Sequence, residues 1–350
     1  MTRSKFTNFV MILTLIATCL VFTQIEGCGR RETMIETLSF SSDDSRICVT
    51  KLNAQDAQTP MKHYKQNVSR TISWLNAADA KSGGILHQDF KPGNCGPAFG
   101  LWWVGRTSVV CNPANGQLAA ADFGGGDFTI DVGAERPVVV TLKQPVSNLA
   151  FSKSGRFLAA SGISEITVWD NKINAAAMRV DQDNFGFLNA ALMAFTDDDT
   201  RIVAAGFQGV HVWDIATAMK VSTIIHGSKP SVSAIVVAPD DTLVVCSSQG
   251  VQRYDFAGNV VKSFSGRIGC LCAISATGQH LAVGGHDEIT VFDLLSNEAV
   301  RTIPYEGATA LALSSHGDEL AVGNSEGRVT LIDTLTGHRR WDNSPAARYR

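Results

Sequence analysis

The sequence has no excess of basic residues and contains little proline. Its 350 residues include 30 Lys and Arg against 33 Asp and Glu, which gives a formal net charge of −3. A general nucleic-acid surface needs a basic excess to displace counterions from phosphates, so this balance argues against a nucleic-acid partner. Ten prolines beside 31 glycines exclude collagen-like and proline-rich linker chains. A hydrophobic content of 45% suffices for a packed core and argues against wholesale disorder.

Motifs of catalysis and metal binding are also missing from the sequence. The eight histidines show no metal-type spacing with Cys or carboxylate neighbours. Residues 323–327 (Gly-Asn-Ser-Glu-Gly) match Gly-x-Ser-x-Gly but fall in an expected turn between two strands, so they do not form the strand-to-helix elbow of a hydrolase. Residues 124–126 (Gly-Gly-Gly) lack the following Lys-Ser/Thr and helix of a phosphate-binding loop. We therefore expect no catalytic residue, no metal site and no cofactor, and we interpret the protein as a non-enzyme.

The first 28 residues have the layout of an export signal. Arg3 and Lys5 precede an uncharged apolar stretch from Phe6 to Phe22, which as a helix would extend about 25 Å. We expect a signal peptide, a lipoprotein signal or a membrane-anchor helix over residues 1–28, followed by a linker over residues 29–36.

The end of this segment resembles a bacterial lipobox, in which a small residue precedes the Cys that becomes lipidated. The run is Ile25-Glu26-Gly27-Cys28, and Glu26 departs from the usual small uncharged residue. The resemblance implies lipidation at Cys28 and a membrane-tethered protein of the cell envelope. Simple cleavage with secretion, an uncleaved anchor and a buried helix of the domain are the alternatives.

A sequence repeat of alternating apolar strands and polar turns recurs along the rest of the chain. Its copies end in the aspartates Asp131, Asp170, Asp214, Asp255, Asp293 and Asp333, which lie 38 to 44 residues apart. A degenerate first copy begins at Leu38, so there are seven units. Such a period holds four short strands with their turns, the size of one propeller blade. We predict an all-β fold, a seven-bladed β-propeller of four-stranded antiparallel blades over residues 37–342, with a C-terminal tail over 343–350.

A large residue precedes most of the terminal aspartates. These residues are Trp169, Trp213, Tyr254, Phe292 and Ile332. We expect them to pack between neighbouring blades, and we expect each following Asp to accept turn N–H groups that close the hairpin into the fourth strand. Gly258, Asn297 and Gly337 follow three or four residues later, where that hairpin requires positive φ.

The endings Val168-Trp169-Asp170 and Val212-Trp213-Asp214 resemble the signature of WD-repeat β-propellers. The resemblance covers roughly residues 37–342. It departs from the family in lacking the Gly-His dipeptide at that family's position in the repeat, near which only His226 lies, so the buried Asp-His-Ser/Thr-Trp network of that family is incomplete here. The resemblance implies a platform that binds a protein or a peptide.

The first blade, residues 37–106, is irregular because it contains 70 residues, whereas one four-stranded blade with its turns needs about forty. Its third strand is expected at residues 72–76. Trp102 and Trp103 lie among the additional residues of this blade, which we interpret as a candidate binding loop. The alternative is that the two tryptophans cover the edge of the blade. At the other end of the chain, residues 338–342 are expected to supply the outer strand of the last blade.

Four cysteines occupy repeat positions that otherwise hold apolar residues. They are Cys48, Cys111, Cys246 and Cys272. We expect them to act as small buried hydrophobic residues rather than as disulfide partners.

Taken together, these features favour a non-catalytic interaction scaffold, exported and tethered to a membrane, that binds an unknown protein or peptide across one rim. The turns between the second and third strands, such as residues 208–209 and 325–326, are expected on that rim. One alternative is a lactonase-like hydrolase with a metal or a small ligand in the central channel. The other is a structural lipoprotein without a discrete ligand.

Overall fold

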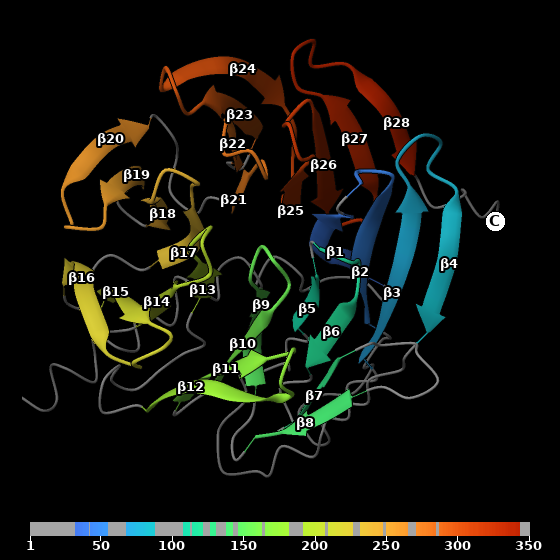
Figure 1. Cartoon of the computed structure of the whole chain (residues 1–350). Coiled ribbons are helices and arrows are strands. Elements are labelled where there is room, and N and C mark those ends of the chain that lie inside the picture. The colour runs from blue at the N-terminus through green and yellow to red at the C-terminus, as the bar shows by residue number, and fades with distance from the viewer. Residues whose placement is uncertain are drawn as a thin grey trace, which may run out of the picture. The chain divides into compact units, whose positions relative to one another are not determined.

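The computed structural model describes residues 32–41, 43–54, 68–87, 108–112, 114–121, 127–130, 138–142, 146–162, 165–181, 192–206, 209–226, 232–247, 250–264, 271–284 and 287–343. All of these residues belong to one compact unit. Within them there is no helix, and the strands form seven four-stranded antiparallel sheets in a propeller-like arrangement (Figure 1). The helix expected over residues 1–28 lies outside the described residues.

Each sheet is made by one continuous stretch of chain. The first sheet comprises β1 (Glu32–Phe40), β2 (Arg46–Ala54), β3 (Val68–Asn76) and β4 (Ser82–His87). The second comprises β5 (Ser108–Cys111), β6 (Leu118–Ala121), β7 (Asp127–Ile130) and β8 (Val138–Thr141). The third comprises β9 (Val146–Phe151), β10 (Phe157–Gly162), β11 (Glu165–Asp170) and β12 (Ala175–Asp181).

The remaining four sheets repeat this order. The fourth comprises β13 (Leu192–Phe195), β14 (Arg201–Gly206), β15 (Gly209–Asp214) and β16 (Lys220–His226). The fifth comprises β17 (Val232–Val237), β18 (Thr242–Ser247), β19 (Gly250–Asp255) and β20 (Val260–Phe264). The sixth comprises β21 (Leu271–Ile274), β22 (His280–Gly284), β23 (Glu288–Asp293) and β24 (Glu298–Pro304). The seventh comprises β25 (Ala308–Leu313), β26 (Glu319–Asn324), β27 (Val329–Asp333) and β28 (Arg339–Asn343).

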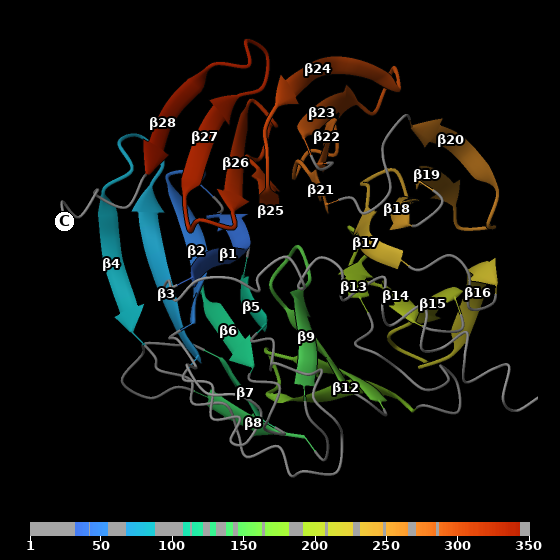
Figure 2. The same cartoon turned by 180° about the vertical axis from the view of Figure 1, so that it is seen from behind.

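The first strands of neighbouring sheets contact one another in series. Contacts run from β5 through β9, β13, β17 and β21 to β25, and β1 contacts both β5 and β25. Figures 1 and 2 show these first strands innermost and the fourth strands outermost. The contact between β1 and β25 joins the two ends of the described chain, because β1 begins the first sheet and β25 begins the seventh.

The hydrophobic core lies between the sheets. Each of six apolar clusters combines residues of two neighbouring sheets, including one cluster shared by the seventh and first sheets. Trp213 of the fourth sheet, for example, packs with Phe157 and Ile166 of the third. Tyr254, Phe292 and Ile332 likewise join clusters with the preceding sheet, and Trp169 packs against such a cluster. The expected packing of large residues between sheets is thus confirmed, and it covers the apolar face that each sheet alone would expose.

The first and last sheets begin and end at slightly different residues from those predicted from the sequence. β1 begins at Glu32, so residues 32–36 belong to a strand rather than to the linker expected over 29–36. Residues 339–343 form β28, the fourth strand of the seventh sheet, so the C-terminal stretch supplies that outer strand as expected. β3 contains the strand expected at residues 72–76 and is longer. The sheets therefore extend over residues 32–343.

Candidate binding face

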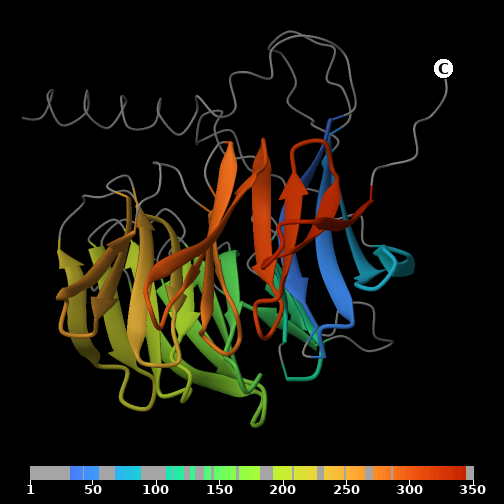
Figure 3. The ribbon, with the colours of Figure 1, turned by 90° about the horizontal axis from the view of Figure 1, so that it is seen from above.

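Two sets of turns share one end of every sheet, because antiparallel neighbours reverse direction at each turn. We call this end the turn face: it carries the turns between the first and second strands and those between the third and fourth strands. Figure 3 shows the sheets from the side, with their strands running between the two ends. In five sheets a backbone hydrogen bond of 2.7–3.0 Å joins the two turns. The donors are the N–H groups of Ala77, Asn171, Ile215, Leu294 and Thr334.

The turns between the first and second strands share one backbone feature in all seven sheets. A residue in the left-handed region occurs in each of them, with φ between 55° and 82°. These residues are Asp44, Gly116, Gly155, Asp199, Asp241, Gly278 and Gly317. Glycine, Asp and Asn are the residues that tolerate this conformation, which explains why the turn sequences are rich in them.

A buried Ser or Thr closes most of these first turns from within. Its hydroxyl accepts the N–H of the residue five positions later, as in Glu319 N–H to Ser314 Oγ at 3.0 Å. The equivalent residues are Ser41, Ser152, Thr196 and Ser275. Sequence reasoning did not single out this set of positions, although a Ser or Thr directly after five of the seven first strands is a visible signal.

The terminal aspartates fix the turns between the third and fourth strands. Five of them accept turn N–H groups at 2.8–3.0 Å, as predicted. They are Asp170, Asp214, Asp255, Asp293 and Asp333. Gly258, Asn297 and Gly337 have positive φ, also as predicted. Asp131 lies outside the described residues.

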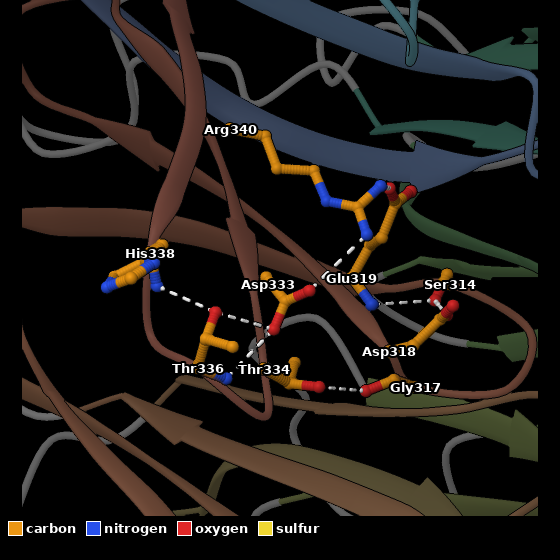
Figure 4. A network of polar contacts seen from close by, with 9 residues as sticks. All are labelled: Ser314, Gly317, Asp318, Glu319, Asp333, Thr334, Thr336, His338 and Arg340. Carbon is orange, nitrogen blue, oxygen red and sulfur yellow. Dashed lines mark hydrogen bonds and ion pairs between the residues drawn. The ribbon is translucent and has the colours of Figure 1, made fainter.

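Figure 4 shows the two turns of the seventh sheet. Asp333 Oδ1 accepts both the N–H and the hydroxyl of Thr336 at 2.8 Å, and Thr334 Oγ1 donates to the Gly317 carbonyl at 2.7 Å. The Thr336 bonds lower the pKa of Asp333, so this carboxylate stays ionised at neutral pH. Arg340 adds ion pairs to Asp333 and to Glu319. These hydrogen bonds and ion pairs hold the two turns in place.

Adjacent sheets are also linked through their first turns. Asp199 accepts the Ser152 hydroxyl at 3.0 Å, and Asp44 accepts the Ser315 N–H at 2.9 Å. His280 Nδ1 lies 2.9 Å from the His316 carbonyl oxygen. The turns thus support one another between sheets as well as within them, and the turn face is stiff in consequence.

The turn face presents exposed apolar side chains on each of five consecutive sheets. They lie in or next to the turns between the third and fourth strands, and 52–81% of each residue is exposed. They are Ile173, Met219, Val260, Leu295 and Leu335, which we call the apolar band. Scattered apolar residues on a surface are ordinary. A recurrence at equivalent turns of every sheet from the third to the seventh is not scattered, and the band is the candidate site.

The other sequence-derived candidates lie beyond this region. Cys28, Trp102 and Trp103 fall outside the described residues, as do residues 208 and 249 of the rim expected at the opposite end. Ser325 and Glu326 of that rim are described and lie in an exposed or half-exposed turn. Among the described residues, no cluster of three or more His, Cys, Asp or Glu has the arrangement of a metal site. The described part of the chain also has no helix able to span a membrane.

Two polar features of the sheet junctions were not predicted. The buried Arg253 donates to the Leu294 carbonyl at 2.7 Å and to Asn297 Oδ1 at 3.0 Å, and it pairs with Asp240. Arg253 occupies the position that Val212 and Val291 hold in the neighbouring sheets. A charged residue at a repeat position that is otherwise apolar is the feature of the sequence that could have predicted this network.

The second feature is a pair of thiols. Cys246 is fully buried and Cys272 half-buried, and both belong to the cluster between the fifth and sixth sheets. Cys48 is buried as expected, while the burial of Cys111 is not described.

Comparison with known proteins adds no relative: no protein-family model matches the chain, and no curated protein matches it.

Proposed function

We propose that the seven sheets are the blades of one closed seven-bladed propeller, a divergent member of the WD-repeat class. The contacts of the first strands in series, including β1 with β25, support a closed ring. The apolar cluster shared by the seventh and first sheets supports it further, because it matches the clusters between sheets that are consecutive in sequence.

We further propose that this propeller is a non-catalytic scaffold that binds a protein with an extended apolar surface through the apolar band. The observation that carries this proposal is the exposure of five apolar side chains on turns held by hydrogen-bonded aspartates. Rigid turns lose little conformational entropy on binding, and large apolar side chains at the centre of an interface contribute most of its affinity.

Export and tethering at Cys28 are part of the same proposal. β1 begins at Glu32, four residues after Cys28, and four residues extend at most about 14 Å. β1 runs toward the turn at Asp43 and Asp44, so its first residue lies at the end opposite the turn face. A lipid on Cys28 would hold that opposite end close to the membrane. The turn face would then point away from the bilayer and remain accessible to a partner.

Photo-crosslinking residues placed at single positions test the docking face. Leu295 and Leu335 are the test positions, and Glu326, exposed in a turn at the opposite end, is the matched control. We expect the same protein to be cross-linked from both leucine positions and not from position 326. We also expect the Leu295→Ser/Leu335→Ser double variant to bind that protein at least about tenfold more weakly with unchanged thermal stability.

Three outcomes would contradict parts of the proposal. Cross-linking from position 326 alone would place the docking face at the other end. Stoichiometric tightly bound metal in the purified protein would favour the hydrolase alternative instead. A Cys28→Ser variant that stays membrane-bound, together with a wild type that incorporates no labelled fatty acid, would refute the lipid tether.

A further inference from the structure

Two cysteine side chains meet across the junction between the fifth and sixth sheets. Cys246 lies on β18, where it pairs with Ala234 and Val251, and Cys272 lies on β21, opposite Val283. Both side chains belong to one apolar cluster, and the interaction with the Cys272 side chain is the largest cause that raises the pKa of the Cys246 thiol. The residues come from different sheets, so a covalent bond between them would join two blades rather than two strands of one blade.

The surroundings of the pair favour a disulfide over a reactive nucleophile or a metal site. The cluster around them consists of apolar side chains such as Val244, Leu281 and Phe292. The interaction with the Cys272 side chain and burial raise the pKa of the Cys246 thiol, because neither favours a thiolate. A reactive nucleophile or a metal ligand needs the thiolate, whereas a disulfide is uncharged and suits an apolar junction.

We propose that Cys246 and Cys272 form a disulfide that joins the fifth and sixth sheets. The reaction is an exchange with a small-molecule or protein disulfide of the oxidising compartment. The two cysteine thiols lose two protons and two electrons and form one S–S bond, while the S–S bond of the oxidant breaks and yields two thiols. In the cell the proposal rests on the export part of the proposed function, since disulfides persist in oxidising compartments.

The difference in exposure between the two thiols sets the order of events. Cys272 is the more accessible, so it forms the mixed disulfide with the oxidant first, and Cys246 then attacks it. The buried Cys246 thiol reacts slowly once the sheets have packed, so the bond forms during folding. After packing it is shielded from reductants. It encloses the 25 residues from position 247 to 271.

The test is made on the purified full chain and does not depend on localisation or on a partner. The chain is unfolded with reductant, refolded with reduced and oxidised glutathione, denatured without reductant and alkylated. The Cys272→Ser variant is the control, and its Cys246 should be alkylated completely. Cys246 and Cys272 should resist alkylation until a reductant is added. Chymotryptic cleavage after Leu271 separates Cys272 from Cys270 and identifies the linked partner by mass.

Two variants keep the test decisive. Cys270→Ser should retain the cross-link, and Cys272→Ser should lose it. Oxidised wild type should unfold at a temperature about 5 °C above that of the reduced protein, and the Cys272→Ser variant should show no such difference. Complete alkylation of Cys246 and Cys272 after oxidative refolding, or a bond from Cys246 to Cys270, would overturn the proposal. Either result would leave the proposed docking of a partner untouched, and failure to find a partner would leave the disulfide untouched.

Discussion

Two junctions between sheets differ in the polar contacts that supplement their apolar clusters. One lies between the seventh and first sheets, and the other lies between the fifth and sixth sheets. The fifth and sixth sheets follow one another in sequence, and their apolar cluster is supplemented by Arg253. The seventh and first sheets meet through residues up to 274 positions apart. Their cluster is supplemented by three separate side-chain links rather than by one.

Those three links compensate for the missing chain connection. Thr309 Oγ1 donates to the Ile35 carbonyl at 2.6 Å, and Trp341 Nε1 donates to the Ala77 carbonyl at 2.7 Å. Asp44 accepts the Ser315 N–H. Each described sheet is built from one continuous stretch, so no strand is exchanged between the first and seventh sheets. The comparison teaches that side chains join the seventh sheet to the first at this junction, which we call the closing junction. Removing these side chains should affect stability more than equivalent changes at the other junctions.

The largest effect is expected from Gly323→Ala at the closing junction. A Cβ added to Gly323 would lie 2.6 Å from Ile35 Cβ, a branched carbon that cannot turn away. We expect a loss of about 3 kcal/mol in the free energy of unfolding, measured by urea titration. The matched control is Gly284→Ala, whose Cβ would meet the mobile Cδ1 of Leu311 at 3.0 Å and should have a smaller effect. Equal effects at both sites would remove the distinction between the junctions.

At the junction of the fifth and sixth sheets, Arg253→Met should cost about 2 kcal/mol. The substitution preserves much of the buried apolar stem but leaves the Leu294 carbonyl and Asn297 without their donor. Asp240 is 55% exposed and becomes hydrated, which limits the loss. Lys153→Met is the control: its ion pair with Asp197 joins two exposed side chains at the junction of the third and fourth sheets, and we expect a change within about 0.5 kcal/mol. An Arg253 variant as stable as wild type would show that this network is not part of the junction's stability.

Trp341→Phe isolates a single hydrogen bond across the closing junction. The ring remains apolar and aromatic while the donor to the Ala77 carbonyl is lost, so we expect a loss of about 1 kcal/mol by urea titration. Trp169→Phe offers a matched control, because its buried indole N–H has no hydrogen-bond partner. That substitution should be neutral or slightly stabilising. Equal losses in the free energy of unfolding for the two variants would contradict a stabilising role of the Trp341 hydrogen bond.

The smallest effect is a dependence of stability on acid. Hydrogen bonds from Ser41 and Ser45 lower the pKa of Asp43 to about 2, and those from Thr336 lower the pKa of Asp333 below its ordinary 3.8. A carboxyl whose pKa is lower in the folded state stabilises the fold above its unfolded pKa and loses that contribution as pH falls toward the folded value. Stability should therefore decline from about pH 4 to pH 2. Asp333→Asn should flatten this decline when the urea midpoint is followed against pH, whereas a steeper decline would contradict the assignment.

The sequence predicted features that repeat locally. The Asp of each copy and the residues of positive φ follow from the chemistry of a single turn, and Trp213 or Phe292 reaches a junction because strand side chains alternate. β1 was partly missed since its first residues, Glu32 and Thr33, carry no apolar alternation. Periodicity alone does not show that the seventh sheet covers this strand.

The second sheet shows how a turn shifts a register. At its turn between the second and third strands, six residues separate the paired Ala121 and Phe128, whereas four separate Ser161 and Ile166 in the third sheet. Ile130 accordingly pairs with Ala119 as Val168 pairs with Ala159, a shift that repeat spacing does not reveal. The apolar band and the thiol pair escaped prediction for another reason. Both depend on how separate sheets are placed, and that information is absent from any single copy.

Distances between spin labels on equivalent turns test the closed ring most directly. Labels at Ala78, Lys172, Leu295 and Leu335 lie at exposed positions of the turns between the third and fourth strands in the first, third, sixth and seventh sheets. The closed ring predicts that the 78–335 distance, measured by pulsed electron paramagnetic resonance, matches the 295–335 distance and is shorter than the 172–335 distance. A 78–335 distance that is the longest of the three would show an open row of sheets and contradict the account.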